Sequence, residues 1–269
     1  MRIRTLVAVL LTSSTALTGC DVFSSQDPAI ERWGGPVTEL RAQWTAAPGI
    51  DLLSGPAVPV RAYLESRWLA QWAGNIDYAY PGFTDAVPPD EEGPDIRARQ
   101  RRPILDGQIA SPFTGTDHFR ILSITGSGRD LSAIICNYTY SVSIKNDDGS
   151  YYSVVRSLSG EPRGIFAERI SLTAPAPQTQ PALPPQEGPA PAPSVNVFGG
   201  WQIVGNLAYV SVSLPGFDNV WPTYDADTQA CVDQAPDPPA KIAFLINGNH
   251  PRTDFPTSPA SPGWPGKSD

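Results

Sequence analysis

Apolar residues between positions 59 and 73 recur at intervals of three and four, which is the spacing of one face of an α-helix. Pro59 suits a first helical turn, and Gly74-Asn75 supplies a stop signal. We therefore expect an amphipathic helix from Pro59 to Ala73. Its apolar stripe comprises Val60, Tyr63, Leu64, Trp68 and Trp72, while Arg61, Glu65 and Arg67 fall elsewhere.

Residues 131–145 alternate in a period of two, which predicts a long β-strand. One face of this strand carries Ile134, Cys136, Tyr138, Tyr140, Val142 and Ile144. Residues 118–125, 151–158 and 166–172 are also typical of strands, and turn residues separate them. We expect an antiparallel meander whose apolar face is covered by the N-terminal helix.

The remaining elements are expected as follows. Residues 38–44 fit either a strand or a helix, and residues 81–117 are loop-like. Residues 201–204 and 207–214 predict a hairpin, and a short helix over 224–234 would carry Cys231. The expected fold class is therefore α+β, with the N-terminal amphipathic helix packed on a curved antiparallel sheet of about five to six strands.

Proline sets the domain organisation, because the chain has 30 prolines and each removes a backbone donor. They concentrate in segment 174–194, which predicts a polyproline II linker or excursion, and in an extended tail over residues 251–269 that packs only locally. We expect one α+β domain over residues 37–250, interrupted by segment 174–194 and joined by long Pro-rich loops.

The N-terminus has the parts of a lipoprotein signal peptide. Arg2 and Arg4 precede an apolar run over residues 6–11, and Leu17-Thr18-Gly19-Cys20 fits the cleavage and lipidation motif. The apolar run is too short for a transmembrane helix. We predict that residues 1–19 are removed, that Cys20 is lipidated and that residues 20–36 form a flexible tether. The alternative is an ordinary secretory signal with a chance cysteine.

The two other cysteines, Cys136 and Cys231, are left as a pair once Cys20 carries lipid. In an oxidising compartment we expect them to form a disulfide closing a loop of roughly 95 residues. In the chain-entropy model this contributes about 3 to 5 kcal/mol. The alternative is two buried free thiols.

Charge and motifs exclude several functions. The net charge is −8, and loss of Arg2 and Arg4 takes the mature chain to about −10, opposite to a nucleic-acid binder. Motifs of serine hydrolases, zincins and P-loop NTPases are absent, and His118 and His250 fit structural or surface roles. We predict no catalytic residues, no metal and no cofactor.

Four aromatic residues are candidates for a ligand pocket: Trp68, Trp72, Tyr138 and Tyr140. If helix and sheet pack as expected, these side chains either form core or line a cavity for an apolar ligand. Both interpretations stay open from the sequence.

Six stretches carry a family resemblance: residues 59–66, 80–83, 135–138, 221–227, 251–256 and 262–265. Together they resemble an uncharacterised family of mycobacterial exported proteins and lipoproteins, and the resemblance covers most of the mature chain. It implies no particular activity. The order of elements also resembles the NTF2-like or cystatin-like architecture, which hosts both enzymes and binding modules.

The sequence thus predicts a non-enzymatic lipoprotein, anchored on the extracytoplasmic face of the cell membrane, which binds a protein partner or an apolar, lipid-like envelope ligand. Two alternatives remain. One is an envelope hydrolase that uses carboxylates, and the other is a scaffold that uses the Pro-rich segment as a spacer or docking site.

Overall fold

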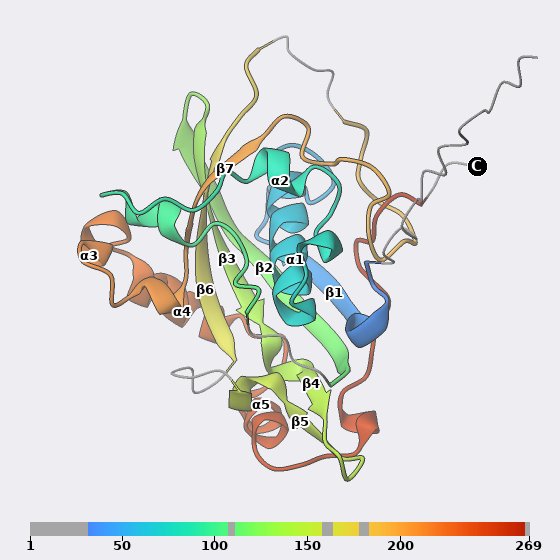
Figure 1. Cartoon of the computed structure of the whole chain (residues 1–269). Helices are drawn as coiled ribbons and strands as arrows, with labels where there is room; N and C mark the ends of the chain where they lie inside the picture. The colour runs from blue at the N-terminus through green and yellow to red at the C-terminus, as the bar shows by residue number, and fades with distance from the viewer. Residues whose placement is uncertain (1–31, 107–110, 158–163, 178–182, 267–269) are drawn as a thin grey trace, which may run out of the picture.

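A curled, largely antiparallel sheet and a few helices make up the computed structural model, which confirms the α+β class (Figure 1). The structure describes residues 32–106, 111–157, 164–177 and 183–266. The strands are β1 Glu39–Ala46, β2 Phe113–Ser127, β3 Asp130–Tyr138, β4 Val142–Lys145, β5 Tyr151–Ser153, β6 Ile165–Thr173 and β7 Gln202–Leu207. The helices are α1 Ala57–Ala73, α2 Phe83–Ala86, α3 Phe217–Val220, α4 Tyr224–Asp233 and α5 Pro239–Ile246.

The sheet has the order β5-β4-β2-β3-β6-β7, and β1 pairs with β2 in parallel. The segment that fitted either strand or helix is therefore a strand. The expected long strand over 131–145 is broken by a 3₁₀ turn at Thr139–Ser141. This turn lets β4 return to the start of β2, where Phe113 pairs with Ile144, while β3 pairs with the rest of β2.

Helix α1 begins at Ala57 and ends where Gly74 adopts a left-handed conformation with φ 62°. Its polar residues are not solvated: Arg61, Glu65 and Arg67 are all buried. The physical reason is that β1 and the sheet cover one side of α1 while loops and the C-terminal tail cover the other (Figure 1). The helix is therefore enclosed rather than amphipathic at a surface.

Two hydrophobic clusters lie on opposite faces of the sheet. Ala133 and Ile135 of β3 join the cluster around α1, whereas Cys136 and Tyr138 join the cluster under α4 and α5. Of the face predicted to pack under the N-terminal helix, the part up to Tyr140 packs under the C-terminal helices, whereas Val142 and Ile144, which follow the 3₁₀ turn, join the cluster around α1. Period-two alternation identified the face, but both faces of β3 are buried, and the pattern alone did not say which helix covers which face.

The predicted hairpin over 201–214 is wrong, because residues 202–207 form one strand, β7, paired with β6. Gly205 does not turn the chain. A Cβ there would lie 2.7 Å from the Cβ of Arg97, so glycine permits close approach of a neighbouring segment. Helix α4 matches its expected range, and α5 was not anticipated.

Candidate functional site

Arg61 of α1 joins the loop before this helix to two distant segments through its guanidinium group. Nη1 donates to the carbonyl oxygens of Leu52 at 2.9 Å and Gln186 at 3.2 Å. Nη2 donates to those of Pro262 at 2.6 Å and Gly263 at 3.3 Å. The side chain is fully buried, and hydrogen bonds from a charged donor are strong in such surroundings. Arg61 therefore fixes a loop, the Pro-rich segment and the tail against one helix.

Glu65, one turn further along α1, accepts hydrogen bonds from three aromatic side chains. Trp44 Nε1 lies 2.7 Å from Oε1, while Tyr80 Oη lies 2.5 Å and Trp264 Nε1 2.8 Å from Oε2. Burial raises the pKa of Glu65, while Arg61 and the three donors oppose that rise. The carboxylate thus joins β1, the loop after α1 and the tail.

The C-terminal tail packs far more deeply than expected. The indole of Trp264 is buried, and the Arg61 guanidinium lies 4.2 Å from the centre of its ring. Trp264 also pairs by backbone with Ala190 of the Pro-rich segment, and Gln186 N donates to Leu53 O at 2.8 Å. The tail and the described part of the Pro-rich segment therefore belong to the fold around α1.

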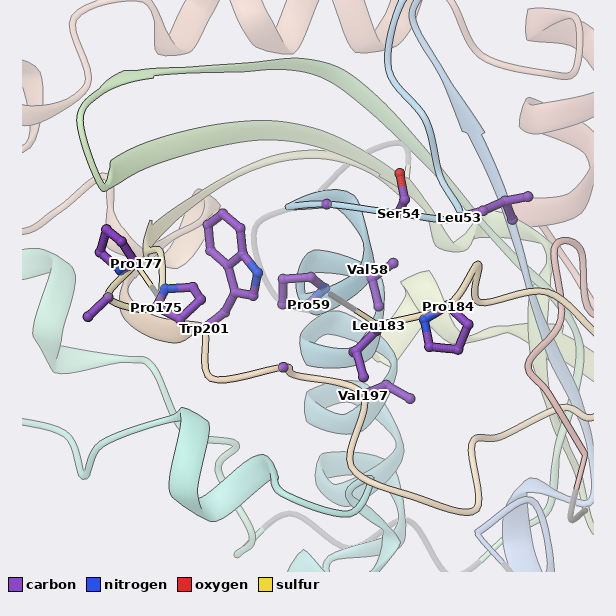
Figure 2. Close-up of a pocket in the computed structure, with 13 residues that line it drawn as sticks. Leu53, Ser54, Val58, Pro59, Pro175, Pro177, Leu183, Pro184, Val197 and Trp201 are labelled. Atoms are coloured by element: carbon purple, nitrogen blue, oxygen red, sulfur yellow. The ribbon is translucent and has the colours of Figure 1, made fainter. Parts of the chain in front are cut away.

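These ties create an open groove of about 490 Å³ over the N-terminal turns of α1. Figure 2 shows Pro175, Pro177 and Trp201 on one side of those turns and Leu183, Pro184 and Val197 on the other. Val58 and Pro59 of α1 also line it. Prolines contribute four of these eight side chains, which gives the groove stiff, apolar walls.

A second groove of about 540 Å³ adjoins the first, and Leu183, Pro184 and Val197 line both. Pro265 and Gly266 of the tail form part of its wall, and Val195 beside it is 64% exposed. Among the residues that the structure describes, none that lines either groove is charged, in a chain of which 17% is charged. An uncharged, apolar group is what such walls accept.

The four aromatic residues predicted to form a pocket lie on opposite faces of the sheet. Trp68 and Trp72 pack in the cluster around α1, and Trp72 stacks on Phe113 with ring centres 5.1 Å apart. Tyr138 and Tyr140 belong to the cluster under α4 and α5. The sheet separates the two pairs, so they do not line one cavity.

Sequence reasoning missed the groove because its walls come from four loop segments and a helix end. The density of proline in segment 174–194 was the available signal. We interpreted it as an extended linker, because proline content indicates stiffness but not the surface against which the segment packs.

Three carboxylates are buried in the core near α1: Glu65, Asp117 and Glu168. Burial raises the pKa of each, and Glu168 and Glu65 raise that of Asp117 further. A cavity of only about 10 Å³ touches Glu65 and Asp117, which is room for one water molecule at most. In the part of the chain that the structure describes, none of the three residues is more than 3% exposed, so their carboxylates are not presented to a substrate.

Asp117→Asn is expected to stabilise the protein at neutral pH by about 1 to 3 kcal/mol, because a neutral amide of the same shape avoids the cost of either burying or protonating the carboxylate on folding. Because the pKa of Asp117 is raised in the folded protein, the carboxyl group favours folding most below about pH 4, where it is protonated in both states. This stabilisation is lost as the pH rises through the pKa that Asp117 has in the folded protein. The advantage of the variant should therefore grow from pH 4 to pH 8 in urea unfolding curves. Exposed Asp147→Asn is the control, and an equal gain there would contradict the assignment.

The chain matches no protein-family model, no curated protein and no solved structure. Its resemblance to exported mycobacterial proteins stays a prediction. In the described ranges no helix has the length and apolar character to cross a membrane, and no group of three metal-ligating side chains forms a metal site. Cys20 and the signal peptide lie outside the described residues.

The disulfide between Cys136 and Cys231 is confirmed, with the two Cα atoms 5.3 Å apart. It joins β3 to α4 on the face of the sheet away from α1. Both cysteines are fully buried, so the bond is structural rather than an exposed redox site.

Proposed function

We propose that the mature protein is a non-enzymatic lipoprotein on the extracytoplasmic face of the cell membrane, and that it binds an apolar group of an envelope molecule. The observation that carries the proposal is the uncharged double groove whose walls are tied to Arg61. A binding surface needs walls that persist without ligand, and four hydrogen bonds from a buried guanidinium provide them.

The expected ligand carries an alkyl chain or a similar apolar group. Each buried methylene contributes about 0.8 kcal/mol, so burying four carbons of such a chain yields about 3 kcal/mol before the costs of association. Exposed Leu183 stands between the two grooves and is the side chain best placed for this contact. The lipid on Cys20 would keep the groove close to the membrane, where such molecules are concentrated.

Binding is favoured over carboxylate hydrolysis by the position of the acidic groups. Glu65, Asp117 and Glu168 have raised pKa values, as catalytic acids often do, but all three are enclosed in the core. The scaffold alternative loses support because described parts of the Pro-rich segment pack against α1 and the tail instead of extending as a spacer.

Native mass spectrometry of the full chain, extracted from its membrane in mild detergent, tests the proposal. The wild type should carry a diacylglyceryl group on Cys20 and a second, noncovalent apolar ligand. Cys20→Ala should lose the covalent lipid and membrane fractionation. Leu183→Asp should keep the anchor and lose at least tenfold in ligand occupancy.

Leu105→Asp is the matched control, because Leu105 and Leu183 are both 38% exposed and Leu105 lies outside the grooves. If Leu183→Asp retains the ligand, the groove is not the binding site. If Cys20→Ala fractionates with the membrane as the wild type does, the proposed lipid anchor is wrong.

A further inference from the structure

A separate cleft of about 620 Å³ lies at the end of the sheet where the β2–β3 hairpin extends beyond α3 and α4 (Figure 1). It is lined by residues of β2, β3, β6 and β7 and by Arg97 of the 3₁₀ turn Ile96–Arg99. None of its described residues lines either apolar groove. The cleft is therefore a site with a lining of its own.

The polar side chains of β3 and β6 in this cleft share one face of the sheet. Ile170 and Leu172 of β6 pack in the cluster around α1. Arg169 and Ser171 alternate with them along the strand and therefore point to the opposite face. Ser132 of β3 is paired with Ser171 and accepts a hydrogen bond from Arg169 Nε at 2.9 Å, which places it on that face as well.

Arg97 reaches the same face from the 3₁₀ turn. A Cβ on Gly205 would lie 2.7 Å from the Cβ of Arg97 and 3.2 Å from the Cβ of Ser171, so both side chains begin beside this glycine. The Arg97 side chain is 41% exposed, and Arg97 and Arg169 both line the cleft. Two guanidinium groups thus share one cleft in a chain whose net charge is −8.

Each arginine is held in place and still has a terminal nitrogen to offer. Arg97 donates through Nε and Nη2 to the carboxylate of Asp95. Arg169 donates through Nε to Ser132 and through Nη1 to the carbonyl oxygen of Val220. Among the described residues, Arg97 Nη1 and Arg169 Nη2 have no acceptor. A bound anion could accept from both.

The charges around the cleft favour an anion with a single negative charge. Within the described lining, Asp130 is the one acidic side chain, and its Oδ1 accepts from Thr173 Oγ1 at 2.8 Å. Two arginines and one aspartate leave this lining with one net positive charge. Burial lowers the pKa of Arg169 and the charge of Arg97 lowers it further, while Asp227 opposes both. An anion between the two guanidinium groups would relieve their repulsion.

We propose that this cleft binds a phosphodiester whose ester groups carry hydroxyls. Its single negative charge matches the lining, and its two unesterified oxygens match Arg97 Nη1 and Arg169 Nη2. The hydroxyl of Ser171 is only 6% exposed and makes no hydrogen bond within the described residues, so it is available to the ester groups. The cleft has the volume of about twenty water molecules, which is more than a small carboxylate fills.

Two sources share this chemistry, a soluble polyol phosphodiester and the headgroup of an anionic phospholipid. Isothermal titration of the full chain in mild detergent at low salt, with glycerophosphoglycerol and with dihexanoylphosphatidylglycerol, tests both. The lipid is titrated into Leu183→Asp, so that the apolar groove does not contribute. Binding of glycerophosphoglycerol supports a soluble ligand, and binding of the lipid alone supports a headgroup. Glycerate and uncharged diglycerol should bind at least tenfold more weakly, and high salt should weaken phosphodiester binding.

Arg97→Met should weaken phosphodiester binding at least fivefold. Arg99→Met is the matched control, because Arg99 lies in the same 3₁₀ turn, donates to the carbonyl oxygen of Gly93 and does not line the cleft. Its affinity should equal that of the wild type. The urea midpoints of the two variants should agree, because the ion pair of Arg97 with Asp95 is partly exposed and contributes little to stability.

Asp130→Asn should tighten binding about two- to fivefold, because the negative charge in the lining is removed while Oδ1 still accepts from Thr173. Damage to the fold would not produce a gain in affinity. The inference fails if neither phosphodiester binds, if glycerate or diglycerol binds as tightly, if Arg97→Met and Arg99→Met have equal affinity, or if Asp130→Asn binds more weakly than the wild type.

Discussion

Arg61→Met should lower the free energy of unfolding by about 3 to 5 kcal/mol, the usual cost of removing one partner of a buried charged network. Methionine has a similar length but no donors, so the carbonyl oxygens of Leu52, Gln186, Pro262 and Gly263 all lose their bonds to this side chain. The loss also removes the nearby cation that opposes the raised pKa of Glu65.

In Arg61→Met, the segments that Arg61 holds should loosen before the rest of the protein unfolds. Hydrogen exchange by mass spectrometry should show faster exchange in residues 183–190 and 259–266, because Arg61 holds both segments against α1. Ligand occupancy of the apolar groove should also fall in Arg61→Met, because these segments form part of the groove walls. Guanidinium unfolding followed by tryptophan fluorescence measures the change in stability.

Arg129→Met provides the comparison, because Arg129 is exposed and donates to a single carbonyl, that of Ala174. Its cost should stay below about 1 kcal/mol. If the two variants lose similar amounts of unfolding free energy, Arg61 contributes no more than an exposed arginine, and other contacts hold the groove walls.

Local sequence patterns predicted the elements that depend on local physics. The spacing around Trp68 and Trp72 gave the helix over residues 59–73, and Gly74 gave its end. The period of two gave β6 almost to the residue, as Ile165–Thr173. Such patterns report which residues share a face, and that information is contained in a few consecutive turns or pleats.

Patterns failed where the outcome depends on distant chain segments. Arg61 and Glu65 fall outside the predicted apolar stripe, and arginine and glutamate are rarely buried unless paired. Their partners are the tail and the Pro-rich segment, and Pro262 lies 201 residues from Arg61 along the chain. Only the folded structure brings these groups together, so the groove they define was not predictable from one sequence.

The disulfide was predictable because the prediction needed only the number of cysteines and an oxidising compartment. Cysteine number, one lipidation motif and an oxidising location left one pair, and no geometry was required. Which helix the bond would hold was also correct, because Cys231 fell within a recognisable helix. The side of the sheet on which that helix packs was not specified by these arguments.

Replacing both cysteines, as Cys136→Ala with Cys231→Ala, should lower the free energy of unfolding by about 3 to 5 kcal/mol. The bond closes a loop of 95 residues, and the chain-entropy model assigns a loop of that length nearly 5 kcal/mol. Cys231 is the buried residue of α4, so this helix depends on the bond for its hold on β3. Amides of α4 should therefore exchange fastest in the variant.

The apolar groove should survive this change, because it lies with the cluster around α1 on the other face of the sheet. Ligand occupancy in native mass spectra, recorded well below the unfolding midpoint, should match that of the wild type. This separates the disulfide from Arg61, whose loss affects stability and groove together. An unchanged unfolding midpoint in the double variant would mean that packing alone holds α4, and a lost ligand would mean that the two faces of the sheet are coupled.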